Sequence, residues 1–166
     1  MKQASAFCVI NITFEACLLP ADLQNISNGI KRCLFSRLLK YSEEAEGVIC
    51  AFQNIKLLNR QSKIVDESPF IRFNVTADCL VFKPQRGMEI TGTVNMLGLH
   101  YVGLIVGGLF NASIPEDLLP SGSSYDNSSY TWNVKGQQLQ IGSTLRVKVD
   151  RIHDNNGMIN LICSLP

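Results

Sequence analysis

The sequence predicts an α+β protein built from two modules. A strand–helix–strand module is expected at residues 1–83, and a five-stranded β-barrel at residues 84–166. Apolar residues recur every three or four positions only between Asp22 and Tyr41, which indicates a single helix. The other apolar segments alternate with polar residues or are interrupted by glycine, as is typical of short, bent β-strands.

The first module is expected to open with an extended pair, Phe7–Thr13 and Glu15–Leu19, that ends at Pro20. The helix follows over Asp22–Tyr41, with Asp22, Asn25 or Ser27 as its N-cap. Four cations fall outside its apolar stripe and form a basic flank: Lys31, Arg32, Arg37 and Lys40. This flank is either a solvated surface or a docking surface for an acidic partner.

Two further strands complete the first module, at Gly47–Leu58 and at Phe70–Val81. In the second of these, one face carries Ile71, Phe73, Val75, Ala77, Cys79 and Val81, and the other carries Arg72, Asn74, Thr76 and Asp78. The second face turns apolar at Leu80 and Phe82. We therefore expect the module boundary at about Lys83–Pro84, and we expect Phe82, Lys83 and Pro84 to be part of the partner-docking surface.

The second module contains five strand signals, separated by turns and by one long excursion. Small barrels close only when their strands bend sharply, and interior glycines permit such bends. The stretch Pro115–Asn133 lacks apolar periodicity and predicts an insertion loop or a flexible flap. Five short strands with a long excursion after the third indicate an OB-type barrel. The expected strands are Met88–Asn95, His100–Val106, Leu109–Ile114, Ser143–Ile152 and Met158–Ser164, the last preceded by the turn Asp154–Gly157.

A candidate single-stranded RNA site lies on the outside of this barrel. In the fourth strand Leu145, Val147 and Val149 alternate with outward cations, and the alternation slips after Asp150, where a bulge is expected. Rings that stack on bases and cations that follow phosphates make such a site. The alternative is that Phe110 is core, His100 and Tyr101 border a turn, and the cations only aid solubility. The candidate residues are His100, Tyr101, Phe110, Arg146, Lys148 and Arg151.

Composition and sequence signals argue against several classes of protein. The net charge is +1 with 17% charged residues, which argues against a highly basic nucleic-acid coat protein. The longest apolar run, Val102–Phe110, is too short to cross a bilayer, and the N-terminus lacks a secretory h-region, so no membrane partner is expected. The six cysteines include no C-x-x-C pair and are expected to be reduced core thiols. Five N-x-S/T sequons are read as coincidental, since Asn11 and Asn74 fall in predicted strands.

Catalytic motifs are missing from the sequence. It contains no phosphate-binding glycine loop followed by lysine, no H-E-x-x-H and no G-x-S-x-G. His100 and His153 have no nucleophile or metal partner at a recognisable spacing. We expect no catalytic residue, no metal and no cofactor.

Five segments together form a recognisable pattern: Phe7–Asn11, Leu38–Tyr41, Gly47–Ile55, Phe82–Pro84 and Phe110–Pro115. With them the chain resembles the larger stalk subunit of the eukaryotic and archaeal RNA polymerases, and within that family the form belonging to RNA polymerase I. The resemblance extends from about Phe7 to Leu165, and the last of the matching segments is the most discriminating.

The resemblance implies a nuclear and nucleolar subunit without catalysis of its own. Its first module would dock on the RNA polymerase I core subunits, and its barrel would project as a stalk near nascent single-stranded RNA. It would also help recruit the initiation factor that acts at ribosomal RNA promoters, and a small companion subunit would accompany it in some lineages. The alternatives are a free-standing OB-fold RNA-binding protein and a small secreted glycoprotein.

Overall fold

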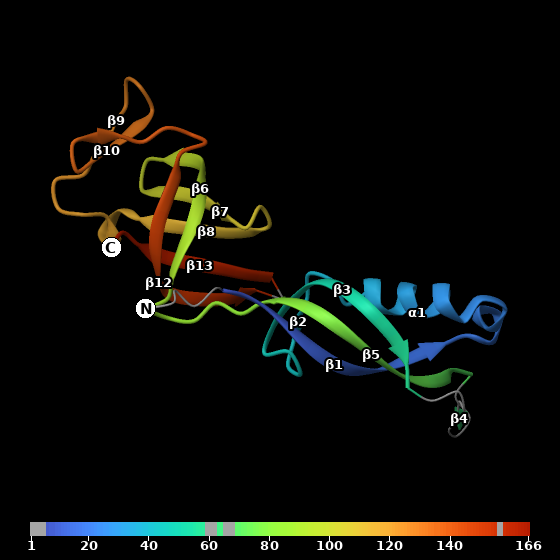
Figure 1. The fold of residues 1–166 in the computed structure, drawn as a ribbon. Helices are drawn as coiled ribbons and strands as arrows, with labels where there is room; N and C mark the ends of the chain where they lie inside the picture. Colours follow the sequence, from blue (N-terminus) through green and yellow to red (C-terminus); the bar gives the residue numbers. More distant parts are fainter. Residues whose placement is uncertain (1–5, 59–62, 65–68, 156–157) are drawn as a thin grey trace. The chain divides into compact units, whose positions relative to one another are not determined.

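The computed structural model describes residues 6–58, 63–64, 69–155 and 158–166. Within them the chain forms two compact units, one of Phe7–Lys83 and one that contains Pro84–Pro166 (Figure 1). The first unit is a sheet with one α-helix, and the second contains a closed five-stranded barrel. The predicted α+β class and the OB-type barrel are confirmed.

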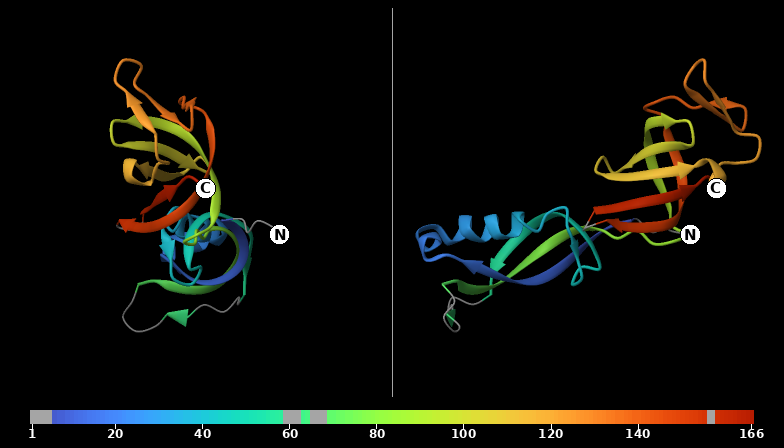
Figure 2. Two further views of the ribbon diagram at one scale, coloured as in Figure 1. Left: turned by 90° about the vertical axis from the view of Figure 1, so that its left-hand side faces the viewer. Right: turned by 180° about the vertical axis from the view of Figure 1, so that it is seen from behind.

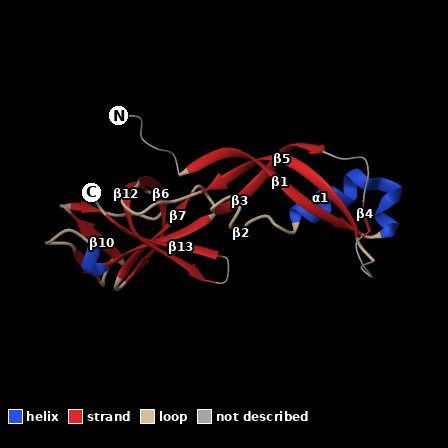
Figure 3. Cartoon of the chain, turned by 90° about the horizontal axis from the view of Figure 1, so that it is seen from below, coloured by secondary structure: helices blue, strands red, loops and turns tan. Residues whose placement is uncertain are grey.

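An antiparallel sheet forms the first unit, in the order β1-β5-β3-β2 with β4 added beside β5. Figure 3 shows the helix α1 against these strands. The two segments predicted between Phe7 and Leu19 are one continuous strand. The elements are β1 (Phe7–Leu18), a 3-10 helix (Pro20–Asn25), α1 (Ile26–Phe35), β2 (Tyr41–Ser42), β3 (Gly47–Leu57), β4 (Lys63–Ile64) and β5 (Ile71–Phe82).

The helix is shorter than the apolar period predicts. Its N-cap is Asn25, one of the three predicted candidates, whose side-chain oxygen accepts a hydrogen bond from the Asn28 N–H at 3.2 Å. The helix ends at Phe35, so the prediction that it continues to Tyr41 is wrong. Leu39 adopts a left-handed conformation at φ 58°, and its N–H donates to the Ile49 carbonyl at 2.8 Å. Pairing with β3 thus replaces the helix where the apolar spacing still continues.

The core of the first unit lies between α1 and one face of the sheet. Ile30 and Leu34 of the helix pack in one cluster with Phe14 of β1 and with Phe73 and Val75 of β5. The strand face predicted to be apolar, from Ile71 to Val81, is buried as expected. This packing fixes which face of the sheet is left to solvent.

A hydrogen-bonded polar cluster occupies the opposite face of this sheet. Asp78 accepts from the Asn11 amide at 2.7 Å and from the Asn54 amide at 2.8 Å, and Thr76 donates to Asn11 at 2.7 Å. These hydrogen bonds hold the pKa of Asp78 below its ordinary value of 3.8, because they favour the carboxylate form. The cluster ties β1, β5 and β3 together on the face that α1 does not cover.

The barrel has the OB strand order, with β12-β13-β8-β7-β6 closed into a ring (Figure 2). All pairs are antiparallel except β13 with β8, which is parallel. The register of β12 against β13 shifts between Val149 and Arg151, so the bulge expected after Asp150 is confirmed. The strands are β6 (Glu89–Gly98), β7 (Tyr101–Val106), β8 (Phe110–Pro115), β12 (Thr144–Asn155) and β13 (Met158–Ser164). The predicted turn at Asp154–Gly157 lies partly outside the described residues.

The excursion after β8, predicted as an insertion loop or a flexible flap, contains regular secondary structure that the sequence did not indicate. It holds a short 3-10 helix (Glu116–Leu118) and a three-stranded sheet. Trp132 is only 1% exposed, and its indole N–H donates to the Gly98 carbonyl at 2.7 Å. Val134 and Leu139 are also buried, so a few apolar side chains with Trp132 among them anchor a segment rich in polar residues. The strands of this sheet are β9 (Ser124–Asp126), β10 (Thr131–Val134) and β11 (Gln137–Gln138).

The Asp78 cluster generates a prediction about protonation. Asn54 has φ 52°, so Asn54→Gly keeps the backbone conformation while it removes one donor to the carboxylate. We expect the pKa of Asp78 to rise toward 3.8, as measured by NMR titration of its side-chain carboxyl carbon. Because the folded pKa lies below the unfolded one, the cluster's contribution to stability is present above pH 3.8 and is lost as the pH falls through the folded value.

Asp126 provides an internal control for that titration. Its pKa is also lowered, by hydrogen bonds from Ser129 and Ser128, and it lies in the other unit. An Asp78 pKa unchanged in the variant, or an equal rise at Asp126, would contradict the assignment of Asn54 as a donor.

Candidate functional site

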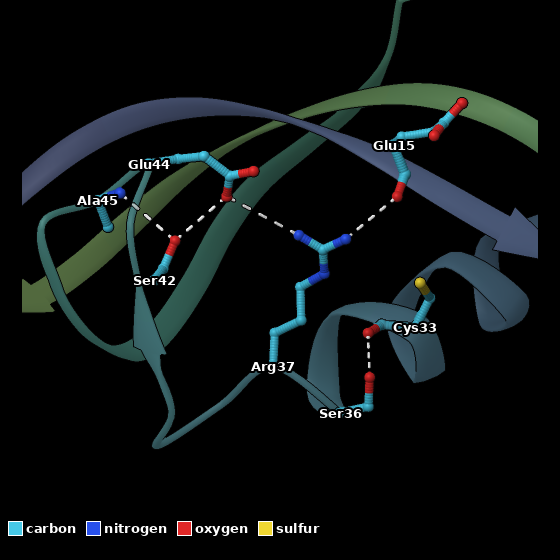
Figure 4. A network of polar contacts seen from close by, with 7 residues as sticks. All are labelled: Glu15, Cys33, Ser36, Arg37, Ser42, Glu44 and Ala45. Atoms are coloured by element: carbon cyan, nitrogen blue, oxygen red, sulfur yellow. Dashed lines mark hydrogen bonds and ion pairs between the residues drawn. The ribbon is translucent and has the colours of Figure 1, made fainter. Parts of the chain in front are cut away.

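Arg37, one of the predicted docking cations, joins three segments of its own unit (Figure 4). Its guanidinium donates to the Glu15 carbonyl oxygen of β1 at 3.3 Å and lies 4.0 Å from Glu44 Oε2, in the turn between β2 and β3. It also lies 5.2 Å from the centroid of the Phe14 ring. Ser42 Oγ donates to the same Glu44 oxygen at 3.2 Å. Arg37 therefore has a structural role at the end of α1.

Two more predicted docking cations are also paired within the chain. Arg32 forms an ion pair with Asp22, and Lys83 forms one with Glu46. The hydrogen bond between Lys83 and Glu46 raises the pKa of the lysine and lowers the pKa of the carboxyl. These charges are available to a partner only if it competes with the internal pair.

The remaining docking candidates differ in accessibility. Lys31 and Lys40 are exposed and form no ion pair among the described residues. Pro84 is half-buried. Phe82 is fully buried, with its ring 4.9 Å from that of Phe7. The prediction of Phe82 as a contact residue needs correction, because the ring is already packed inside its own unit.

The six predicted RNA-binding residues do not form a single site. Phe110 is only 6% exposed and belongs to the barrel core, which corrects its prediction as a stacking platform. Arg146 and Lys148 point outward from β12, opposite Thr91 and Glu89 of β6. Tyr101 of β7 pairs instead with Gly98, seven positions beyond Thr91 along β6, which corresponds to about 23 Å of strand.

The other predicted residues make local polar contacts. His100 Nδ1 lies 2.9 Å from Glu116 Oε2, and the Tyr101 hydroxyl donates to the Met96 sulfur at 2.8 Å. Arg151 Nε donates to Asp150 at 3.2 Å, and Arg86 approaches the same carboxylate at 3.8 Å. The structure therefore separates the rings at the β6–β7 turn from the cations of β12.

A groove on the outer surface of the barrel was missed by the sequence reasoning. It has a volume of about 260 Å³ and crosses β6, β7, β8 and β13. The only sequence signal was polar residues at alternating positions in β8, where Asn111 and Ser113 separate the buried Phe110, Ala112 and Ile114. The groove is lined by Asn95, Met96, Tyr101, Gly103, Leu104, Asn111, Ala112, Ser113, Asn160 and Leu161.

Strand register explains why these polar side chains converge. Asn160 of β13 is the parallel partner of Asn111 of β8, and Ser113 of β8 is the partner of Gly103 of β7. A Cβ at Gly103 would lie 2.9 Å from the Asn95 side-chain oxygen and 3.1 Å from Met96 Cβ, so glycine leaves room for both side chains where they now lie. The bulge in β6 between Val94 and Met96 brings Asn95 to the same groove.

The groove offers uncharged hydrogen-bonding groups beside an aromatic ring. The side chains of Asn95, Asn111, Ser113 and Asn160 make no hydrogen bond to other described residues. Each amide presents both a donor and an acceptor, which is what the edge of an unstacked base requires. Tyr101, a predicted RNA residue, lines this groove.

Arg151 is the predicted cation nearest to this groove by register. It pairs with Ile162 of β13, which in turn is the parallel partner of Ser113. His153 pairs with Asn160 in the same way. The groove is thus lined by uncharged residues, and Arg151 and His153 lie on β12, the strand next to β13.

The described residues give little support for cysteine-based catalysis or for metal binding. All six cysteines are unpaired, and burial raises the pKa of the Cys79 thiol to about 11 and that of Cys163 to about 12, so both are poor nucleophiles at neutral pH. The described residues hold no group of three or more side chains suited to a metal ion. None of the helices described is long and apolar enough to span a bilayer.

Comparison with known proteins identifies similar sequences. Residues 84–158 match the family model described as "RPA43 OB domain in RNA Pol I". The chain is 33% identical to the DNA-directed RNA polymerase I subunit RPA43 of Danio rerio over 87% of its length, and 33% identical to that of Mus musculus over 84%. It is 29% identical to the rpa43 subunit of Schizosaccharomyces pombe over 85% of its length.

The shares of these relatives that the chain covers differ. It spans 35% of the Danio rerio protein and 39% of the Mus musculus protein. It spans 85% of the Schizosaccharomyces pombe protein. The matched region in each case includes most of both units described above.

The Arg37 contacts predict a loss of stability on removal of the guanidinium. Arg37→Met keeps the apolar stem but removes the contacts to Glu15, Glu44 and Phe14. We expect the free energy of unfolding to fall by about 1 kcal/mol in urea denaturation, because the guanidinium is part-exposed. Lys40→Met is the matched control and is expected to change stability by less than about 0.5 kcal/mol. Equal effects of the two variants would show that Arg37 is a surface cation.

Proposed function

We propose that the chain is a member of the RPA43 family and acts as a non-catalytic subunit of RNA polymerase I. The observation that carries this proposal is the match of the OB barrel to the RPA43 OB domain, together with similarity to named RPA43 subunits across both units. An OB barrel holds nucleic acid or a protein partner on its surface. This proposal places the protein in the nucleus, at the nucleolus.

The unit Phe7–Lys83 is proposed to dock on the polymerase core. Its sheet has one face covered by α1 and another that carries the Asp78 cluster. Lys31 and Lys40 are exposed cations without an internal ion pair in the described chain, so they can meet acidic groups of a partner without breaking a contact. Lys83, at the end of this unit, and Pro84, which follows it in the chain, remain candidate contacts.

The barrel is proposed to contact emerging single-stranded RNA at the groove on its outer surface that Asn111 lines. Uncharged amides and a tyrosine suit a base that is turned out of the stack. Arg151, which is exposed beside the groove, would follow the phosphates. Arg146 and Lys148 lie farther along β12. They would contact phosphates only if the RNA strand extended over that part of β12.

Protein partners of the barrel are part of the same proposal. Large apolar side chains are exposed on it, including Leu109 at 55% and Met158 at 69%, which lie two positions before the parallel pair of Asn111 and Asn160. Exposed apolar side chains that lie together mark contact sites for other proteins. We propose that the initiation factor of RNA polymerase I, and a small companion subunit where one exists, are such partners.

Affinity purification of the tagged chain from nuclear extract tests the subunit proposal. We expect the large subunits of RNA polymerase I among the retained proteins, at stoichiometric amounts after nuclease treatment. Recovery of ribosomes or RNA without polymerase subunits would overturn the proposal and favour a free-standing OB-fold RNA-binding protein.

The RNA proposal makes a separate prediction about salt dependence. Binding of a 12-nucleotide single-stranded RNA is measured by fluorescence anisotropy at several salt concentrations. Arg151→Ala should weaken binding and lower the slope of log K against log salt by about 0.7, as loss of one phosphate contact does. Asn111→Ala should weaken binding by about fivefold or more without changing the slope, because an amide reads a base edge.

Two variants serve as comparisons in that experiment. Asn127→Ala removes an exposed amide of the insertion sheet and should leave binding unchanged. Lys148→Ala tests the opposite part of β12. If Lys148→Ala abolishes binding while Asn111→Ala has no effect, RNA lies on the face of β12 and β6 and not in the groove.

A further inference from the structure

A second groove lies within the first unit, between α1 and β3, which run beside each other in Figure 1. Its volume is about 480 Å³, within the range of clefts that bind ligands. Ile26 and Ile30 line one wall, one helical turn apart, and Ile55 and Leu57 line the other. Each wall of the groove therefore presents two apolar side chains, with polar residues beside them.

The charged side chain that lines this groove is a cation. Lys31 lines the groove, together with the uncharged Ser27, Gln53 and Asn54, and no carboxylate is among the lining residues. Lys31 forms no ion pair in the described chain, whereas the neighbouring Arg32 is paired with Asp22. An occupant that combines apolar and acidic side chains complements both features.

The edge of β3 at this groove is unsuited to an added strand. Residues 39–42 cover the outer edge of β3 only as far as Ile49. Beyond it, the register of β3 shifts between Gln53 and Lys56, with Asn54 at φ 52°. A bulge and a lysine on an edge strand both discourage pairing with another chain. An extended peptide would lose its hydrogen bonds at this bulge.

We propose that the groove between α1 and β3 binds a short amphipathic helix of a partner protein. The apolar side chains of this helix pack against the isoleucines of the groove, and an acidic side chain of the helix pairs with Lys31. Helices that bind in grooves satisfy their own backbone, so the bulge in β3 does not hinder them. This inference rests on the proposed function, since it specifies part of the docking surface of the first unit. It assigns recognition to Lys31 and to the groove, and not to Arg32 or Arg37.

Selection from a displayed library of helical peptides, with the 166-residue chain as target, tests this inference. We expect enriched peptides to carry apolar residues at i, i+3 or i+4 and at least one Asp or Glu on the same face. Ser27→Trp fills the groove from the exposed face of α1 and should weaken binding of such a peptide by about tenfold or more. Asn28→Trp places the same ring outside the lining and should leave the affinity unchanged.

Charge exchange then tests the role of Lys31. Lys31→Glu should weaken binding about fivefold, and replacement of the acidic residue of the peptide by lysine should restore it. Lys135→Glu, an exposed lysine of the other unit, is the matched control outside this groove and should have no effect. Circular dichroism of each variant separates loss of binding from loss of fold.

Three results would overturn the inference. These are an absence of enriched peptides, enriched peptides without acidic residues, and peptides insensitive to Ser27→Trp. The purification of polymerase subunits with the unaltered chain is a separate measurement that does not depend on the peptide selection. If polymerase I is retained and no helical peptide binds, the groove inference fails alone; if polymerase I is not retained by the unaltered chain, the proposed function fails.

Discussion

The long antiparallel register between β1 and β5 is the constraint on which the first unit depends. Each strand has 12 residues, and their partners run without a shift from Phe7 and Phe82 to Leu18 and Ile71. A slip of one residue would move every core side chain to solvent, so the alternation in both strands holds the pairing in place. This pairing gives α1 one continuous apolar surface and leaves Asn11 beside Asp78 on the other face.

In the barrel, the same alternation is combined with local breaks. Buried residues of β7 and β8 fill the interior, and Asn111 and Ser113, which alternate with them in β8, are left to the outer surface. The bulges at Val94–Met96 and Val149–Arg151 bend β6 and β12, and they re-aim Asn95 and Arg151. The groove lined by Asn111 and Asn160 therefore follows from closure of the barrel and from no single motif.

The sequence was sufficient for the elements with strong periodicity. The strand from Ile71 onward, the OB order and the bulge near Arg151 all follow from alternation and its interruption. The end of α1 did not follow, because Leu38 and Tyr41 keep a helical spacing while Leu39 turns toward β3. The insertion sheet was missed because its stability depends on Trp132 and its distant acceptor at Gly98. The groove was missed for a related reason: its residues come from four strands.

The pairing of charges within the chain decides which surfaces can recognise a partner. Arg32, Arg37 and Lys83 each have an acidic or carbonyl acceptor in their own unit, so a partner gains little from them unless it replaces that contact. Lys31 has none among the described residues and stands beside an apolar groove, where apolar burial and charge can act together. On the barrel, the proposed RNA groove is neutral with Arg151 nearby, so it would combine readout of a base with only one phosphate contact. Such a site would hold RNA weakly by itself, which suits the proposed role as a subunit that a larger assembly positions at its ligand.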